Sequence, residues 1–148
     1  MDLEKYRQKR DFRKTPEPEG KHKGGRENRF VVQKHQASHL HYDFRLEMAG
    51  VLKSWAVPKE PPTESGLKRL AVQVEDHELS YADFEGEIPE GEYGAGKVEI
   101  WDKGTYSLID KKPKKIAFKL DGEKLRGKYT LIQFGKQEKN WLLFRVKE

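Results

Sequence analysis

The segment from Gln33 to Glu47 alternates between two kinds of side chain, and this alternation constrains the fold more than any other feature. Side chains on a β-strand point to its two faces in turn. One face would carry the apolar residues of a core, namely Leu40, Tyr42, Phe44, Leu46 and Met48. The other face would carry His39, His41, Asp43, Arg45 and Glu47. Imidazole and carboxylate groups bind divalent transition metals and a guanidinium binds phosphate, so the second face predicts a binding site.

A turn at residues 36–38 would place a second strand, Phe30–His35, beside this segment as a hairpin. His35 would then lie near His41 and Asp43, because same-face neighbours on a strand are only about 7 Å apart at Cα. Such a set offers two ring nitrogens and one carboxylate to a single ion, and Mn²⁺, Fe²⁺ and Zn²⁺ all accept these ligands. The sequence therefore predicts a metal site at His35, His41 and Asp43.

Two further residues are suited to a phosphate group. Arg45 lies on the same face, where its guanidinium would bind two phosphate oxygens; the alternative is an ion pair with Glu47 or a neighbour. His77 ends an apolar run, and imidazole titrates near neutral pH, so it is a candidate general acid or phosphate contact. Gly91–Lys97 matches a phosphate-binding loop by spacing, but Val98 stands where that loop needs Ser or Thr, so nucleotide binding is excluded there.

The composition limits the metal chemistry and the compartment. The 148 residues include no cysteine, so the ligands must be nitrogen and oxygen, which excludes a zinc finger. The length predicts one domain over residues 1–148. No apolar run is long enough to span a membrane and no signal peptide is recognised, which predicts a cytoplasmic protein. The net charge of +5 is compatible with nucleic-acid binding without identifying it.

From residue 29 onward, short runs of branched and aromatic residues alternate with turn signals. This pattern predicts an all-β barrel or sandwich over residues 29–148. Turns are expected at Gly50, Gly104, Asp121–Gly122 and Gly135. The expected strands cover residues 29–35, 39–48, 51–57, 69–76, 96–102, 104–109, 115–120, 126–134 and 140–146.

Residues 1–28 differ in character and predict a basic N-terminal arm. The first 29 residues contain ten Lys or Arg and six Asp or Glu, and Leu3–Arg10 is expected to form a short helix. Two interpretations stay open for this arm. It is either disordered, or it lies along a phosphate backbone and orders on binding.

Several long motifs resemble one known family. They are KRDF at 9–12, TPEP at 15–18, FVVQKHQASHLHYDFRLE at 30–47, LKSWAVPK at 52–59 and VEDHELSYADFEGEIPEGEYGAGKVEIWDKGTY at 74–106. Together with Trp141, they resemble the 3′-phosphoesterase domain of bacterial ATP-dependent DNA ligase D over nearly the whole chain. That domain also occurs alone, and no ligase or polymerase segment is attached here, so the chain is most similar to the free-standing members.

The resemblance implies a compact β-barrel of mostly antiparallel strands with short peripheral helices and the N-terminal arm near the site. It implies a hydrolase that depends on Mn²⁺, with Co²⁺ or Zn²⁺ as alternatives at the same site. Such an enzyme removes a 3′-terminal ribonucleoside from DNA and then converts the 3′-phosphate to a 3′-OH for repair and ligation. The implied partners of the monomer are DNA primer–template 3′ ends and a separately encoded DNA ligase and polymerase.

The resemblance also assigns roles by motif. The metal ligands would be His35, His41 and Asp43. Contacts to the phosphate would come from Arg45 and His77, with Tyr81 nearby. Residues that support the site or contact the substrate would be Gln33, Lys59, Arg69, Arg10, Asp11 and Glu17. Whether His77 donates a proton or only stabilises the phosphate stays open.

Two other classes of protein stay open on the residues alone. A non-haem Fe²⁺ oxygenase also uses two histidines and a carboxylate, here His41, Asp43 and His77, but it would leave His35 without a role. A basic β-barrel that only binds nucleic acid would account for the charge, although not for three metal-type ligands on one face.

Overall fold

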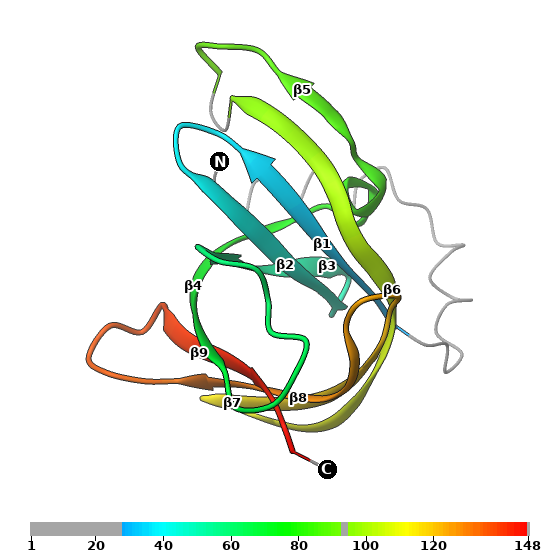
Figure 1. Ribbon diagram of the computed structural model, residues 1–148, viewed down its shortest axis with the longest axis vertical. Helices are drawn as coiled ribbons and strands as arrows, with labels where there is room; N and C mark the ends of the chain where they lie inside the picture. Colours follow the sequence, from blue (N-terminus) through cyan, green and yellow to red (C-terminus); the bar gives the residue numbers. More distant parts are fainter. Residues whose placement is uncertain (1–27, 93–94, 148) are drawn as a thin grey trace.

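The computed structural model describes residues 28–92 and 95–147, which form strands and one short 3₁₀ helix (Figure 1). The elements are β1 (Asn28–Gln36), β2 (Leu40–Met48), β3 (Val51–Val57), β4 (Lys68–His77), η1 (Leu79–Asp83), β5 (Gly86–Ile88), β6 (Gly96–Lys112), β7 (Lys115–Asp121), β8 (Arg126–Gln133) and β9 (Asn140–Arg145). No helix in this part of the chain has the length and apolar character needed to cross a membrane.

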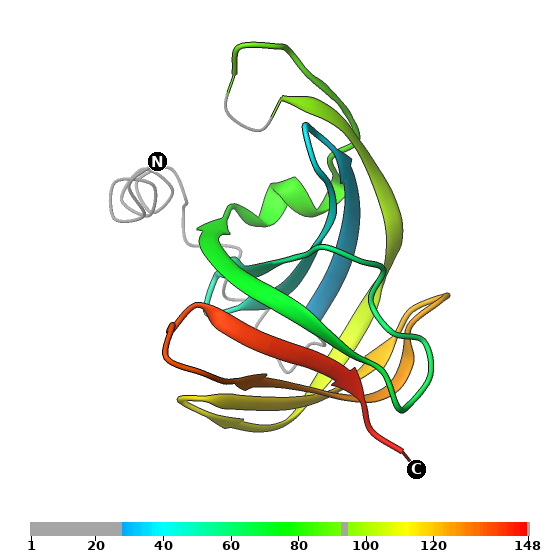
Figure 2. The same cartoon turned by 60° about the vertical axis from the view of Figure 1, so that its left-hand side comes forward.

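Eight of the strands close into an antiparallel barrel in the order β1-β2-β3-β4-β9-β8-β7-β6, because β1 pairs with both β2 and β6 (Figures 1 and 2). Closure removes the exposed sheet edges that would otherwise pair with other chains. The short strand β5 is added outside the barrel on the beginning of β6. The all-β barrel expected from the sequence is confirmed, and the described part contains only η1 as a peripheral helix. The predicted arm and the helix at Leu3–Arg10 lie outside the described residues.

Alternate side chains of the strands fill the barrel. The aromatic ring of Phe44 lies at its centre, fully buried, with ring centroids 5.9–6.4 Å from those of Phe30, Trp55 and Phe118. Truncating such a side chain to Ala typically costs 3–5 kcal/mol. The predicted apolar face of β2 therefore points inward, except that Leu40 is 47% exposed because it begins the strand at the rim.

The structure corrects two strand assignments. Residues 96–102 and 104–109 belong to one strand, β6, and Gly104 lies inside it where the sequence predicted a turn. A Cβ at Gly104 would lie 2.2 Å from the carbonyl oxygen of Asp121, so glycine is needed there for a close approach of two strands. The three-residue strand β5 was not predicted, since its segment is rich in glycine and carboxylates.

A small second layer covers part of the outer surface of the barrel. Ala82 of η1 packs on Val31 and Leu52, which point away from the barrel interior, and Tyr81 and Ile100 border this cluster. The connection from β4 to β5 therefore crosses the outside of the barrel wall. The side chains beneath and beside this crossing are shielded from water, which creates a buried polar site on an outer face.

A candidate metal and phosphate site on the outer face of the barrel

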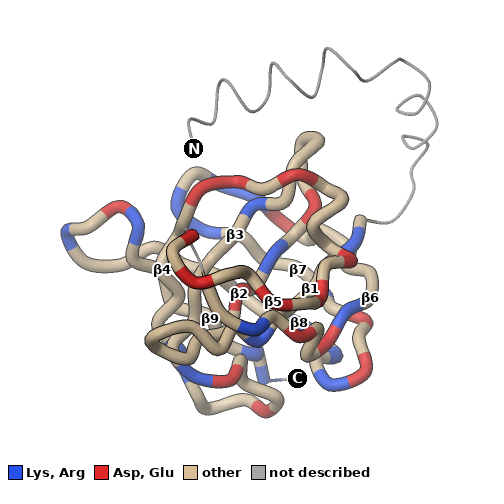
Figure 3. Tube along the Cα trace, turned by 90° about the horizontal axis from the view of Figure 1, so that it is seen from above, with Lys and Arg blue, Asp and Glu red and all other residues tan. Residues whose placement is uncertain are grey.

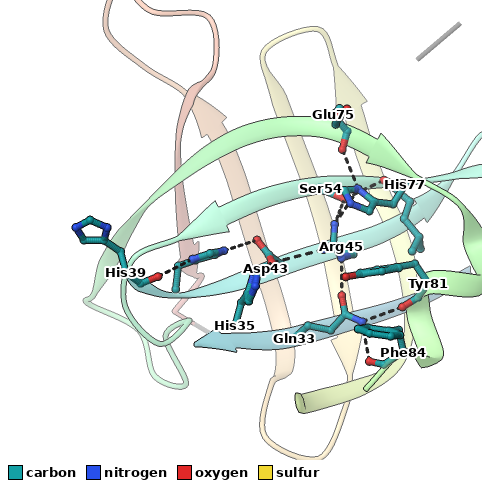
Figure 4. Close-up of polar contacts among 12 residues, drawn as sticks. Gln33, His35, His39, Asp43, Arg45, Ser54, Glu75, His77, Tyr81 and Phe84 are labelled. Carbon is teal, nitrogen blue, oxygen red and sulfur yellow. Dashed lines mark hydrogen bonds and ion pairs between the residues drawn. The ribbon is translucent and has the colours of Figure 1, made fainter. Parts of the chain in front are cut away.

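The hairpin of β1 and β2 brings the predicted metal ligands together. His35 lies opposite His41, and Gln33 lies opposite Asp43, in the register of the two strands. Their side chains point outward because the alternating residues, such as Phe44, point into the core. The alternation that was read from the sequence thus separates core from site along β2. Figure 4 shows the site side chains of this strand, Asp43 and Arg45.

His35, His41 and Asp43 form a compact group, hereafter the triad. Their candidate ligand atoms all lie within 4.8 Å of one another. Nδ1 of His35 is 3.7 Å from one carboxylate oxygen of Asp43, and Nε2 of His41 is 3.3 Å from the other. Two imidazole nitrogens and a carboxylate are ligands that fit a divalent transition metal. The structure therefore brings together the three residues predicted as a metal site.

Backbone contacts orient the ring of His41. Its Nδ1 lies 3.0 Å from the carbonyl oxygen of His39, and since a carbonyl only accepts, Nδ1 carries the proton. Nε2 is then the atom that faces Asp43, as in metal sites where a backbone carbonyl fixes the tautomer. The ring of His39 itself turns away from Asp43 (Figure 4) and is exposed, so His39 does not join the triad.

The charges of the triad are strongly coupled. Burial alone would raise the pKa of Asp43, but the hydrogen-bonding rings of His35 and His41 and the charge of Arg45 together hold it well below its usual range. The hydrogen bond to Asp43 raises the pKa of His41 against the opposing effect of burial. Asp43 is consequently a carboxylate at any moderate pH, which is the protonation state that a metal requires.

Arg45 is the second buried charge of the site and is only 3% exposed. Its guanidinium donates to Gln33 Oε1 at 2.6 Å through Nε and to Ser54 Oγ at 2.7 Å through Nη1. Nη2 lies 3.5 Å from the Asp43 carboxylate, and the guanidinium also lies 4.9 Å from the ring centre of Tyr81. Because these contacts hold the buried guanidinium in place, Arg45 is a fixed positive charge directly beside the triad.

Gln33 ties this charge to the covering layer. Its side chain is fully buried, and its amide nitrogen donates to the carbonyl oxygens of Tyr81 at 2.8 Å and Phe84 at 3.2 Å. Its amide oxygen accepts from Arg45. The predicted supporting residue Gln33 is therefore brought into the site and connects η1 to the guanidinium.

His77, at the end of β4, approaches Arg45 from another strand. Its Nδ1 lies 3.1 Å from Arg45 Nη1 and 3.1 Å from the carbonyl oxygen of Glu75. Burial lowers the pKa of His77, and the charge of Arg45 lowers it further, so the ring is neutral at pH 7. Its ring centre lies 5.0 Å from that of Tyr81, which in turn stacks on Phe84.

Other predicted residues stand differently. Lys59 is exposed just after β3. Arg69 donates through Nε to the carbonyl oxygen of Glu60 at 2.8 Å, which is not a contact with the triad. Arg10, Asp11 and Glu17 lie outside the described residues. His77 is not part of the group of possible metal ligands. The oxygenase alternative expected His41, Asp43 and His77, whereas the structure brings His35 to the other two in place of His77.

Ser54 is the site residue that sequence reasoning missed. It is fully buried on β3, opposite Arg45 in the register with β2, and its hydroxyl donates to the carbonyl oxygen of Leu52 while accepting from Arg45. A single small hydroxyl between Lys53 and Trp55 was the only signal in the sequence. Without the β2–β3 register it could not be assigned to Arg45.

The fold and the site define a closed β-barrel that carries a two-histidine, one-carboxylate group beside a buried arginine. The chain belongs to the DNA Ligase D 3′-phosphoesterase domain family, whose match covers residues 33–133 and thus every described residue of the site. The family resemblance inferred from the sequence motifs is confirmed.

Longer proteins contain regions similar to nearly the whole chain. The Multifunctional non-homologous end joining protein LigD of Pseudomonas aeruginosa is 53% identical over 99% of this chain and 19% of its own length. The Multifunctional non-homologous end joining DNA repair protein LigD of Mycobacterium tuberculosis is 48% identical over 98% of this chain and 20% of its length. A relative from Mycolicibacterium smegmatis is 46% identical. The chain therefore spans about a fifth of the length of these relatives.

Proposed function

We propose that this chain is a divalent-metal-dependent phosphoesterase that acts at DNA 3′ ends. It would remove a 3′-terminal ribonucleoside, leaving a 3′-phosphate, and then hydrolyse that phosphate to a 3′-OH. The observation that carries the proposal is the triad directly beside the buried guanidinium of Arg45, in a member of a 3′-phosphoesterase family. The relatives named for end joining support DNA ends as the substrate and DNA repair as the setting.

The triad would hold the metal, with Mn²⁺ as the proposed ion. A bound divalent ion neutralises phosphate charge and helps to position the phosphate for attack by water. The donor set fits this role because Asp43 is held ionised and Nε2 of His41 is oriented toward the carboxylate. Zn²⁺ and Co²⁺ accept the same three ligands and are the alternative ions for this site.

Arg45 and His77 would act on the phosphate itself. Arg45 provides a positive charge in a water-poor setting, where it stabilises negative charge on the phosphoryl oxygens more effectively than in water. Neutral His77 has two tautomers. In one, Nδ1 accepts from Arg45 and Nε2 carries the proton. In the other, Nδ1 donates to the backbone carbonyl oxygen of Glu75 and Nε2 has a lone pair. The ring could therefore present a donor or an acceptor without changing its charge.

Other residues would hold Arg45 in place or lie near the substrate. Gln33 and Ser54 would hold Arg45 in place, and Tyr81 would border the substrate through its contact with the guanidinium. Lys59 and Arg69 would support the site or contact the substrate. The protein would work in the cytoplasm as a monomer, together with a DNA ligase and a DNA polymerase.

The testing experiment uses a labelled primer–template with a 3′-phosphate, assayed with Mn²⁺ and with EDTA. We expect conversion to a 3′-OH that requires the metal and is lost in His41→Ala. His39→Ala is the matched control, since it removes an exposed imidazole only two residues away and should retain activity. Conversion by His41→Ala at the wild-type rate would refute the triad as the catalytic metal site. A second substrate ending in a single ribonucleotide tests the phosphodiesterase step in the same variants.

A further inference from the structure

Two surface hollows lie along β6 and meet at Thr105. The first, of about 590 Å³, is lined by the stretch from Ile100 to Thr105, where none of the described strands pairs with the edge of β6 between β5 and β7. The second, of about 310 Å³, is lined by Thr105, Lys119 and Arg126 among others. Ala82 of η1 also lines the first hollow, so the hollow begins beside η1. We call the two hollows together the β6 groove.

The β6 groove carries more available positive charge than negative charge. Asp102, which lines it, is buried and accepts three hydrogen bonds from the backbone N–H groups of residues 123–125. Asp83 is paired with Arg29, and Asp121 with Arg126. Among the ion pairs of the described residues, the lining lysines at 103, 119 and 124 have no carboxylate partner, and Glu123 is the remaining acidic residue of the lining.

Two segments in the second half of the chain differ in charge. Residues 75–99 contain nine Asp or Glu and one Lys, whereas residues 103–147 contain thirteen Lys or Arg and four Asp or Glu. Figure 3 marks both groups along the trace. A polyanion is attracted by the second segment and repelled by the first. The β6 groove lies at the border of the basic segment, since β6 leads directly into it.

The register of β7 and β8 adds an independent observation. Lys119 and Lys128 lie directly opposite one another, with Ser107 of β6 on the other side of Lys119. Like charges opposed across neighbouring strands destabilise a sheet. Lys119 is the member of this pair that lines the second hollow, where a bound phosphate would neutralise it.

We propose that the β6 groove binds the phosphate backbone of the double-stranded part of the same DNA whose 3′ end lies at the triad, an inference that rests on the proposed function. Val98 lies opposite His35, and nine residues along an extended strand separate it from Ser107, a path of at most about 30 Å. Duplex DNA rises about 3.4 Å per base pair, so about nine base pairs would cover this path. Lys103 and Lys119 would neutralise phosphates along it.

A peptide strand added to the open edge of β6 is the competing occupant, and the edge is poorly suited to it. The backbone N–H of Ile100 already donates to Glu85, and the carbonyl oxygen of Trp101 already accepts from Lys124. Strand addition depends on such main-chain groups. These side chains therefore block the edge as a template while leaving the lysines of the groove exposed to solvent.

The test measures binding of a labelled DNA duplex of about sixteen base pairs with a 3′-OH end, which is not turned over, at several salt concentrations. Replacing one phosphate-binding lysine should weaken binding roughly eightfold at 0.1 M salt and lower the slope of log Kd against log salt by about one. We expect this for Lys103→Gln and for Lys119→Gln. Lys136→Gln, an equal charge change in the loop between β8 and β9, is the matched control and should bind like the wild type.

Unfolding and activity measurements distinguish a lost DNA contact from a damaged fold or a damaged catalytic site. Lys119→Gln should unfold at about the wild-type temperature, because the side chain of Lys119 is exposed. With a 3′-phosphate substrate, both groove variants should raise KM and leave kcat unchanged. Wild-type binding by both variants, or equal weakening by Lys136→Gln, would overturn the proposal. Because the binding assay needs no turnover, a protein that binds through these lysines but processes no 3′ end would refute the proposed function alone.

Discussion

Gln33→Met tests the link between Gln33, η1 and the buried guanidinium. Methionine has nearly the same length and fills the same space, but it can neither accept from Arg45 nor donate to the carbonyl oxygens of Tyr81 and Phe84. A buried polar group left without a partner costs about 1–3 kcal/mol. The Tyr81 carbonyl keeps the backbone N–H of Phe84 as a donor, so it loses little. The Phe84 carbonyl is partly buried and belongs at the low end, whereas the Nε of Arg45 is fully buried and belongs near the middle.

The losses at Phe84 and Arg45 together predict a decrease of about 3 kcal/mol in the free energy of unfolding. For a chain of this size, that corresponds to a fall of roughly 6–12 °C in Tm. Denaturant unfolding, monitored by tryptophan fluorescence, gives the free energy directly. Gln73→Met, at a half-buried glutamine of β4, is the matched control and should change it by less than about 1 kcal/mol.

Gln33→Glu separates the two halves of the link. The carboxylate still accepts from Arg45, but it faces the carbonyl oxygens of Tyr81 and Phe84 without an N–H to donate. We expect this variant to keep Arg45 in place and to lose the anchor of η1. A Gln33→Met protein that unfolds within about 1 kcal/mol of the wild type would refute the assignment of these hydrogen bonds as the anchor.

Four further outcomes are expected. Arg45→Lys should lose most activity in the 3′-phosphate assay, because one ammonium cannot replace a guanidinium whose nitrogens contact four side chains; near-normal rates would contradict this role. His77→Gln should flatten the loss of stability below about pH 6.5, because the fold lowers the pKa of His77 and the unfolded chain therefore binds the extra proton. Mn²⁺ at about 100 times its Kd should stabilise the wild type by about 2.7 kcal/mol and leave His41→Ala unchanged in thermal scans. Gly104→Ala should destabilise by about 2–3 kcal/mol in denaturant titrations, since its Cβ would meet the Asp121 carbonyl.

The parts of the site that the sequence could predict are those fixed by strand periodicity. Alternation along β2 placed Asp43 and Arg45 on one face, and a short turn placed His35 opposite His41. These relations are local, because a hairpin sets its own register through the length of its turn. The same reasoning gave a β-rich fold, and the strands were found to within a few residues wherever a polar turn separated them.

The relations that could not be predicted depend on distant strands. The position of Ser54 beneath Arg45 needs the β2–β3 register, and the contact of His77 with Arg45 needs the irregular pairing of β3 with β4. Gly104 resembled a turn because the sequence does not reveal that β7 ends against it. In each case, the missing information was which part of the chain would come to lie alongside.

The closing pairs of the barrel have a consequence for the order of folding. Strands β1 to β4 follow one another as antiparallel neighbours, whereas closure requires β1 to meet β6 and β4 to meet β9, far along the chain. Contacts between distant segments carry a larger entropy of loop closure and slow the search for the native topology. The triad lies wholly within the first hairpin, so its ligands can assemble early, and a metal ion that binds there would favour the hairpin from which the rest of the barrel is completed.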